Sequence, residues 1–453
     1  MSGAPAGVNV DGRSVTHPDW AATAVLYQIN VRHFTAEGSL QAAASHLPRL
    51  AALGVGILWL MPIHPIGQVH RKGSLGSPYS VRDYRAVNPE FGSLADLRAF
   101  VAQAHELGLR VILDWVAHHT AWDCPLVHER PDWYIRDDDG QLVRSGMFDW
   151  VDVVDLDYRS PVIAEQITAY MSESMAFWVG EAGVDGFRCD IAGLVPTSLW
   201  RRVRHALEEI QPVFLLAEWE DPKLHEAAFD ATYAWGWHDL LRQVAEGRAT
   251  AAQLASWYAQ DQARFAAHDL RMMFVTNHDK NAWDGTDVEL FGPALPAARV
   301  LSLLGPGIPL VFNGQEAGLD RRLAFFDKDE ITWRPDPVGE LIQRLVAIRR
   351  QHRVLWNRPW GAAATIVPTN HPHAVVALSR ADQHEQVLIL VNLSNRPVRS
   401  LRVAPPVPAR LAPGEAATTT LTDLLTGASL DPRAIDLPAW EYRVLLGPGR
   451  ALP

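Results

Sequence analysis

Three carboxylic acids each close an apolar run of the chain, a placement suited to acid–base chemistry. Asp190 ends the run GFRCD, Glu218 follows VFLLA, and Asp279 follows MMFVTNH. Continuous apolar runs of this length are typical of buried strands in a parallel sheet, whose carboxyl ends meet at one edge. Three carboxyl groups placed in this way predict an active site at that edge.

Arg188 lies two residues before Asp190 within the same run. Side chains alternate along a strand, so these two share one face, whereas Phe187 and Cys189 share the other. A guanidinium beside a carboxylate keeps the carboxylate ionised. A purely structural ion pair is the alternative interpretation, because buried charges are usually paired. The two further acids at strand ends favour the active site.

Eight apolar runs alternate with helical patterns along the first three quarters of the chain. We expect strands at 24–30, 55–62, 109–114, 184–190, 213–217, 228–233, 272–278 and 307–316, and helices at 38–53, 94–107, 161–181, 197–210 and 337–352. This alternation indicates a parallel sheet covered on both faces, and eight units favour a closed barrel. We therefore predict an α/β fold, a (β/α)8 TIM barrel, with its active site at the C-terminal ends of the strands.

Two segments interrupt the alternation. Residues 120–158 are rich in Asp, Trp and Pro and are too long for an ordinary connection, which predicts a small inserted lid subdomain after the third strand. Residues 354–453 carry short strand-like runs with Pro-rich turns, which predict an all-β domain, a β-sandwich. The catalytic barrel would then comprise residues 1–119 and 159–353.

Composition narrows the class of partner. The 453 residues are 48% hydrophobic, and 52 acidic residues against 41 Lys and Arg give a formal net charge of -11. An excess of negative charge argues against a nucleic-acid partner or an anionic membrane, both of which favour a basic surface. A neutral or polar small ligand fits better, and 17 Trp residues provide planar rings suited to stacking on sugars.

The cysteine content and the N-terminus favour a cytoplasmic location. Only Cys124 and Cys189 are present, and we expect Cys189 to pack in the core, so no disulfide framework is predicted. The first residues lack a basic start followed by an apolar core, and no stretch approaches the roughly 20 apolar residues of a membrane span. The oligomeric state is left open.

The chemistry-bearing runs resemble the signatures of the α-amylase family, glycoside hydrolase family 13. The resemblance extends from about residue 24 to 335 and follows the family's order. Its motifs are GSPYSVRDYRAVNPEFGS at 76–93, DWVAHHT at 114–120, GFRCDIAG at 186–193, LLAEWED at 215–221, FVTNHD at 274–279 and GIPLVFNGQE at 307–316. Glycoside cleavage needs two carboxyl groups flanking the scissile bond, which agrees with the acids at the strand ends.

The resemblance implies a role for each matching residue. Asp190 would be the nucleophile, Glu218 the acid/base, and Asp279 the carboxylate that stabilises the transition state and binds ring hydroxyls. Four substrate-binding residues are also implied: Tyr79 stacking beneath the sugar, His119 and His278 donating hydrogen bonds to it, and Arg188 keeping Asp190 charged. The mechanism would be a retaining double displacement, which requires carboxyl groups about 5–5.5 Å apart.

The resemblance therefore implies a retaining glycosidase that hydrolyses α-glucosidic bonds of malto-oligosaccharides or related α-glucans. A transglycosylase that passes the same covalent intermediate to another sugar is an alternative, because it would use the same catalytic residues. A sugar-binding relative without activity is a further alternative, although none of the three acids is lost.

Two departures from the family pattern concern calcium. His118 stands where the first signature usually has an Asn that binds calcium, and Leu194 replaces a histidine associated with the same site. A neutral imidazole is a poor calcium ligand. We therefore predict that the usual calcium site is absent and that no cofactor is needed. The cluster Asp137–Asp139 could bind calcium, but its spacing is more typical of a solvated turn.

Two more residues near the motifs have open roles. Asp114 ends the third predicted strand, where we expect it to fix the strand end near Arg188 rather than to react. Trp283 follows Asp279 closely and either packs in the protein or contacts a neighbouring sugar.

Overall fold

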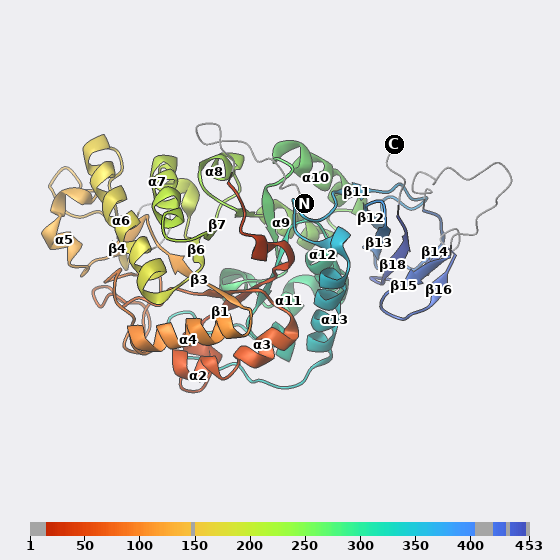
Figure 1. Ribbon diagram of the computed structural model, residues 1–453, viewed down its shortest axis with the longest axis horizontal. Coiled ribbons are helices and arrows are strands. Elements are labelled where there is room, and N and C mark those ends of the chain that lie inside the picture. The colour runs from red at the N-terminus through yellow and green to blue at the C-terminus, as the bar shows by residue number, and fades with distance from the viewer. Residues whose placement is uncertain (1–14, 146–149, 404–419, 432–434, 450–453) are drawn as a thin grey trace.

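The computed structural model describes residues 15–145, 150–403, 420–431 and 435–449. A closed barrel of eight strands is ringed by helices, and antiparallel strands follow at the C-terminal side (Figure 1). The predicted (β/α)8 barrel and all-β C-terminal region are therefore confirmed. The exact domain boundaries drawn from the sequence stay a prediction.

The barrel strands are all paired in parallel with their neighbours. Around the barrel the order is β1-β10-β9-β8-β7-β6-β3-β2. The bounds are β1 (Leu26–Ile29), β2 (Ile57–Leu60), β3 (Arg110–Trp115), β6 (Gly186–Cys189), β7 (Phe214–Ala217), β8 (Ala231–Tyr233), β9 (Leu270–Met273) and β10 (Ile308–Phe312). Each predicted run overlaps one of these strands, so the apolar runs located all eight.

One predicted strand was displaced along the chain. The predicted run 272–278 shares only residues 272 and 273 with β9, because the strand begins at Leu270. Phe274 and Val275 are buried without belonging to the strand, because the chain continues into the core beyond the end of the hydrogen-bonded ladder. Asp279 therefore lies six residues after its strand rather than at the strand end.

Helices cover the outside of the barrel (Figure 1). Their bounds are α1 (Val31–Phe34), α2 (Leu40–Ala44), α3 (Leu47–Leu53), α4 (Leu94–Glu106), α5 (Leu126–Glu129), α6 (Pro161–Ala182), α7 (Thr197–Glu208), α8 (Pro222–Ala227), α9 (Trp235–Ala245), α10 (Ala251–Arg264), α11 (Asp287–Phe291), α12 (Leu295–Leu304) and α13 (Pro337–Gln351). The helix expected at 38–53 is two helices, and Pro48 lies in the first turn of α3, where its missing N–H is tolerated. In the described part of the chain, no helix combines the length and apolar character needed to cross a bilayer.

Large apolar side chains fill the barrel interior. They come from every barrel strand except β6 and are almost completely buried, among them Leu26, Ile57, Trp59, Ile112, Phe214, Leu216, Tyr233, Met272 and Leu310. A second and larger core lies between the strands and the helices; Phe187 and Cys189 belong to it, as their alternation with Arg188 predicts. The filled interior leaves the C-terminal strand ends as the place for a site.

The segment after β3 forms a small hairpin of its own. Strands β4 (His119–Ala121) and β5 (Val153–Asp155) pair in antiparallel fashion, with His119 opposite Asp155. Between them, the Asp137 carboxylate accepts hydrogen bonds from the backbone N–H groups of Asp139 and Gln141 in an exposed turn. Residues 146–149 of the predicted lid lie outside the described residues.

The C-terminal strands form two antiparallel sheets. The six-stranded sheet has the order β11-β12-β13-β18-β15-β16, and β14 pairs with β17. The bounds are β11 (Ala364–Ile366), β12 (Val375–Ala381), β13 (Glu385–Asn392), β14 (Val398–Leu401), β15 (Leu421–Asp423), β16 (Ser429–Leu430), β17 (Ile435–Leu437) and β18 (Tyr442–Pro448). One face of the larger sheet joins the barrel core, and its other face packs on the smaller sheet.

Candidate active site

A cavity of about 480 Å³ lies at the C-terminal ends of the barrel strands. Six of the seven residues predicted for the site line it: Tyr79, His119, Asp190, Glu218, His278 and Asp279. The seventh, Arg188, lies beneath the cavity and contacts two of its acids. The hairpin segment supplies Trp150, Asp152 and Val153 to the wall. The tertiary fold thus brings the whole predicted set together.

Arg188 holds three carboxylates around one buried guanidinium. Its Nη1 donates hydrogen bonds to Asp190 at 2.8 Å and Asp114 at 2.7 Å. Its Nη2 forms an ion pair with Glu218 Oε2 at 2.8 Å. Asp190 and Glu218 can share this group because β6 and β7 are adjacent parallel strands and each acid directly follows its strand. One positive charge therefore faces three acids.

Burial, together with this shortage of positive charge, raises the proton affinity of both acids, and that of Glu218 most. Burial raises the pKa of Glu218 to about 8, and the neighbouring Asp190 and Asp279 carboxylates add to the effect of burial against the opposing Arg188. Burial also raises the pKa of Asp190, to about 6. Of the two acids, Glu218 therefore keeps its proton to the higher pH. Such a pair provides a proton donor beside a nucleophile.

The turn that directly follows Asp190 is strained. Ile191 adopts a left-handed conformation with φ 35° and ψ 46°, which is rare for a β-branched residue and costs of order 1–3 kcal/mol. Its N–H donates to Glu218 Oε2 at 2.9 Å. The strained turn therefore fixes the position of the Glu218 carboxyl relative to Asp190.

A chain of hydrogen bonds orients His278 and Tyr79. Gln28 donates from Nε2 to His278 Nδ1 at 2.7 Å, so the ring proton resides on Nε2, which lies 2.7 Å from Tyr79 Oη. The Tyr79 hydroxyl in turn donates to Asp114 at 3.0 Å. Burial lowers the pKa of His278 to about 4, which keeps the ring neutral. Sequence reasoning missed Gln28, although it is the one polar side chain in the apolar run AVLYQI.

The Asp114 carboxylate accepts hydrogen bonds from three protein side chains. Besides Arg188 and Tyr79, it accepts a hydrogen bond from Trp59 Nε1 at 3.0 Å, and it is 1% exposed. These contacts support the structural role expected for Asp114.

Asp279, in contrast, is open to the cavity. Its side chain is 34% exposed, and its Oδ2 lies 3.3 Å from His278 Nε2. Burial lowers the pKa of His119 to about 3, so this ring is also neutral.

An aromatic wall was only partly predicted. Trp283 is 53% exposed and packs its ring against Phe325, with centroids 5.1 Å apart, and against Phe326. Phe325 also stacks at 6.3 Å from the Tyr79 ring. Sequence reasoning missed Phe325, Phe326 and Trp150. The adjacent aromatics in RRLAFFDKD were the available signal. Trp283 thus both packs and faces the cavity, which leaves its contact with sugar a prediction.

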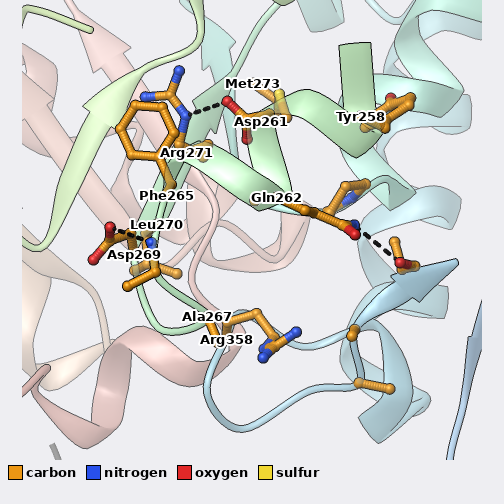
Figure 2. A pocket seen from close by; sticks show the side chains of 16 residues that line it. Tyr258, Asp261, Gln262, Phe265, Ala267, Asp269, Leu270, Arg271, Met273 and Arg358 are labelled. Atoms are coloured by element: carbon orange, nitrogen blue, oxygen red, sulfur yellow. Dashed lines mark hydrogen bonds and ion pairs between the residues drawn. The ribbon is translucent and has the colours of Figure 1, made fainter. Parts of the chain in front are cut away.

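A second cavity, of about 280 Å³, lies at the opposite end of the barrel, beside the start of β9. Figure 2 shows the side chains that line it. It is bordered by α10, the start of β9 and residues 362–364. Within it, Arg271 forms an ion pair with Asp261 at 3.0 Å (Figure 2), and Arg271 also pairs with Glu220. None of the predicted site residues lines this cavity.

The family model of the α-amylase catalytic domain matches residues 9–339 of this sequence. The chain belongs to the α-amylase family. Among solved structures, the noncanonic maltogenic α-amylase AmyB of Thermotoga neapolitana has a TM-score of 0.83 and 27% identity, covering 94% of this chain and 99% of that one. An α-amylase of Lactobacillus plantarum has a TM-score of 0.81 and 30% identity over the same shares. The family resemblance of the motifs is thereby confirmed.

Two curated relatives are longer than this chain. The α-amylase MalA of Haloarcula japonica is 26% identical over 401 residues, which are 84% of this chain and 57% of MalA. A cyclomaltodextrinase of Geobacillus thermopakistaniensis is 24% identical over 89% of this chain and 69% of its own length. The chain thus spans little more than half of MalA.

Proposed function

We propose that this protein is a retaining α-glycosidase that hydrolyses α-glucosidic bonds of malto-oligosaccharides or related α-glucans. The observation that carries the proposal is the arrangement of Asp190 and Glu218 on the single guanidinium of Arg188. This shared contact, together with the hydrogen bond from the Ile191 N–H beside Asp190 to Glu218, keeps the two carboxyl groups near each other. Close spacing is what a retaining pair requires, since inverting enzymes separate their carboxyl groups by about 6.5–9.5 Å to admit a water.

The proposed reaction has two steps. Asp190 attacks the anomeric carbon while Glu218 gives its proton to the leaving oxygen, which forms a glycosyl-enzyme ester. Glu218, now ionised, then takes a proton from water, and the water oxygen displaces Asp190. Asp279, open to the cavity, would stabilise the positive charge that develops on the sugar ring.

Product analysis tests this proposal. The full chain is incubated separately with maltose, maltotriose, trehalose, isomaltose, a cyclodextrin and starch, and the products are followed by mass spectrometry. Proton NMR of the first product should show the α-anomer. A β-anomer as first product would contradict retention, and no cleavage of any α-glucoside would contradict the substrate class.

A transglycosylase is the second candidate, since several relatives are named α-1,4-glucan:maltose-1-phosphate maltosyltransferase. The one from Rhodospirillum rubrum is 32% identical over 303 residues, which are 61% of this chain and 41% of the relative. Repeating the product analysis with an excess of acceptor sugar separates the two candidates. Longer oligosaccharides in place of free glucose or maltose would favour transfer.

We also propose that the protein acts in the cytoplasm. Cys124 and Cys189 are both buried and unpaired, which suits a reducing compartment. Fractionation of cells that produce the protein from its own gene checks the location, and recovery outside the cytosol would contradict it.

A further inference from the structure

The hairpin of the inserted segment places three metal-binding side chains together. His118 and His119 follow β3, and the pairing of β4 with β5 sets Asp155 opposite His119. The Leu156 N–H also donates to the His118 carbonyl at 3.0 Å, which holds the two ends of the hairpin in register. One donor atom of each side chain lies within 4.8 Å of the others. Among the residues that the structure describes, this is the one such group of three.

The distances between the donor atoms fit a tetrahedral ion. His118 Nδ1 lies 3.3 Å from His119 Nδ1 and 3.5 Å from Asp155 Oδ1. Ligands about 2.0–2.1 Å from a tetrahedral Zn²⁺ lie about 3.4 Å from one another. The protein therefore holds two edges of such a tetrahedron near their required length.

The Asp155 carboxylate has an unused oxygen at this place. Its Oδ1 atom is buried and accepts no hydrogen bond. A buried acceptor without a partner is unfavourable, and a bound cation would satisfy it. The Nδ1 atoms of His118 and His119 face each other at hydrogen-bond distance, so either a ring proton or a bound cation can lie between them.

These donors do not fit calcium. Calcium takes 6–8 oxygen ligands, whereas this group offers two imidazole nitrogens and one carboxylate. The nitrogen of His118 stands at the position where the family resemblance implies an Asn oxygen. Imidazole with carboxylate suits zinc and neighbouring first-row metals.

We propose that His118, His119 and Asp155 bind one Zn²⁺ ion, or a first-row divalent ion of similar preference. His118 also borders a separate cavity of about 430 Å³, through which the ion and a water as fourth ligand could enter. His119 borders the substrate cavity, so the ion would lie between the two cavities. It would join the inserted hairpin to the end of β3 beside the active site.

Metal titration of the full chain tests the proposal. The protein is first dialysed against a chelator and then freed of it. Isothermal titration with zinc chloride should show one ion per chain, and zinc should raise Tm by several degrees, because the ion binds the folded state. Calcium at millimolar concentration should change neither signal. No zinc binding, or an equal rise of Tm with calcium, would overturn the proposal.

Two variants locate the ion. His118→Asn replaces a nitrogen donor by an amide oxygen, and Asp155→Asn removes the carboxylate charge; each should weaken zinc binding at least about 10-fold. His128→Asn, at an exposed histidine of the same segment, is the matched control and should bind zinc as the wild type does. Unchanged zinc affinity in the two ligand variants would overturn the proposed location. Each variant is first checked for a wild-type Tm without metal, and if one fails to fold the other carries the test.

Discussion

Two buried acids at opposite ends of the barrel have pKa values that are shifted in opposite directions. Asp230, which precedes β8, is fully buried, and accepts hydrogen bonds from Arg204 at 2.6 Å and the Leu215 N–H at 2.7 Å, with His17 Nδ1 also 2.7 Å away. Burial alone would raise its pKa, but Arg204 and His17 outweigh burial and lower it. Glu218 at the other end is similarly buried, yet its pKa is raised to about 8.

The difference lies in the number of positive partners, not in the depth of burial. Asp230 contacts two basic groups, His17 and Arg204, and Arg204 also pairs with the partly exposed Glu208. Glu218 shares Arg188 with Asp190 and Asp114. A compensated acid stabilises the fold, whereas an undercompensated acid keeps a proton at neutral pH and can deliver it. The variants below test whether each end of the barrel has the role that this comparison assigns.

Asp190→Asn should cause the largest loss. The amide is nearly isosteric but a poor nucleophile, so kcat should fall by at least about 10³-fold. Tm should stay the same or rise, because one carboxylate is removed from the group around Arg188. Steady-state kinetics and thermal melting measure both. Activity above about one hundredth of wild type would argue against nucleophilic catalysis.

Glu218→Gln should reduce kcat on a natural oligosaccharide by about 10²–10⁴-fold, since proton donation is lost. A glycosyl fluoride needs little proton donation, so its first step should be partly rescued. Equal losses on both substrates would contradict the acid/base role.

The same variant should also change how stability depends on pH. Because the pKa of Glu218 is raised in the folded protein, the wild type loses stability as pH rises from about 4.5 through about 8. The variant should therefore melt about 2–4 °C higher than wild type at pH 9 but not at pH 5.

Asp230→Asn should have the reverse profile. Removing one partner of a buried ion pair costs about 3–5 kcal/mol of unfolding free energy, and here it leaves the buried Arg204 with Glu208 as its remaining acidic partner. The lowered pKa of Asp230 means that its contribution is present at neutral pH and is lost only as pH falls below the ordinary value of 3.8. Denaturant unfolding at pH 7 measures the loss, and kcat of the folded fraction should be unchanged. A large fall in kcat without loss of stability would break the comparison.

The pH profile gives the smallest effect, about tenfold per pH unit outside the optimum. The kcat/KM of the wild type should fall below about pH 6, where Asp190 becomes protonated, and above about pH 8, where Glu218 loses its proton. With a glycosyl fluoride the basic limb should weaken. A flat profile between pH 5 and 9 would show that these groups do not titrate as their surroundings suggest.

The apolar runs and the family motifs of the sequence predicted the barrel and seven of the residues at the candidate site. Apolar runs and helical patterns are local, so they located all eight strands, and the acids that follow the runs belong to the same local pattern. The displaced run at 272–278 shows the limit, because an apolar residue can be buried in the core without belonging to a strand. The catalytic roles themselves stay predictions that the variants above would test.

The tertiary structure decided what no local pattern contains. Gln28 orients His278 across 250 residues of chain, and Phe325 of the aromatic wall stacks beside Tyr79, which lies far from it in the sequence. The pKa of Glu218 depends on how many charges share Arg188, and this number is set only when separate strand ends meet. Motifs therefore identified the acids, but long-range packing set their charge balance, because electrostatic energy depends on distances in space rather than along the chain.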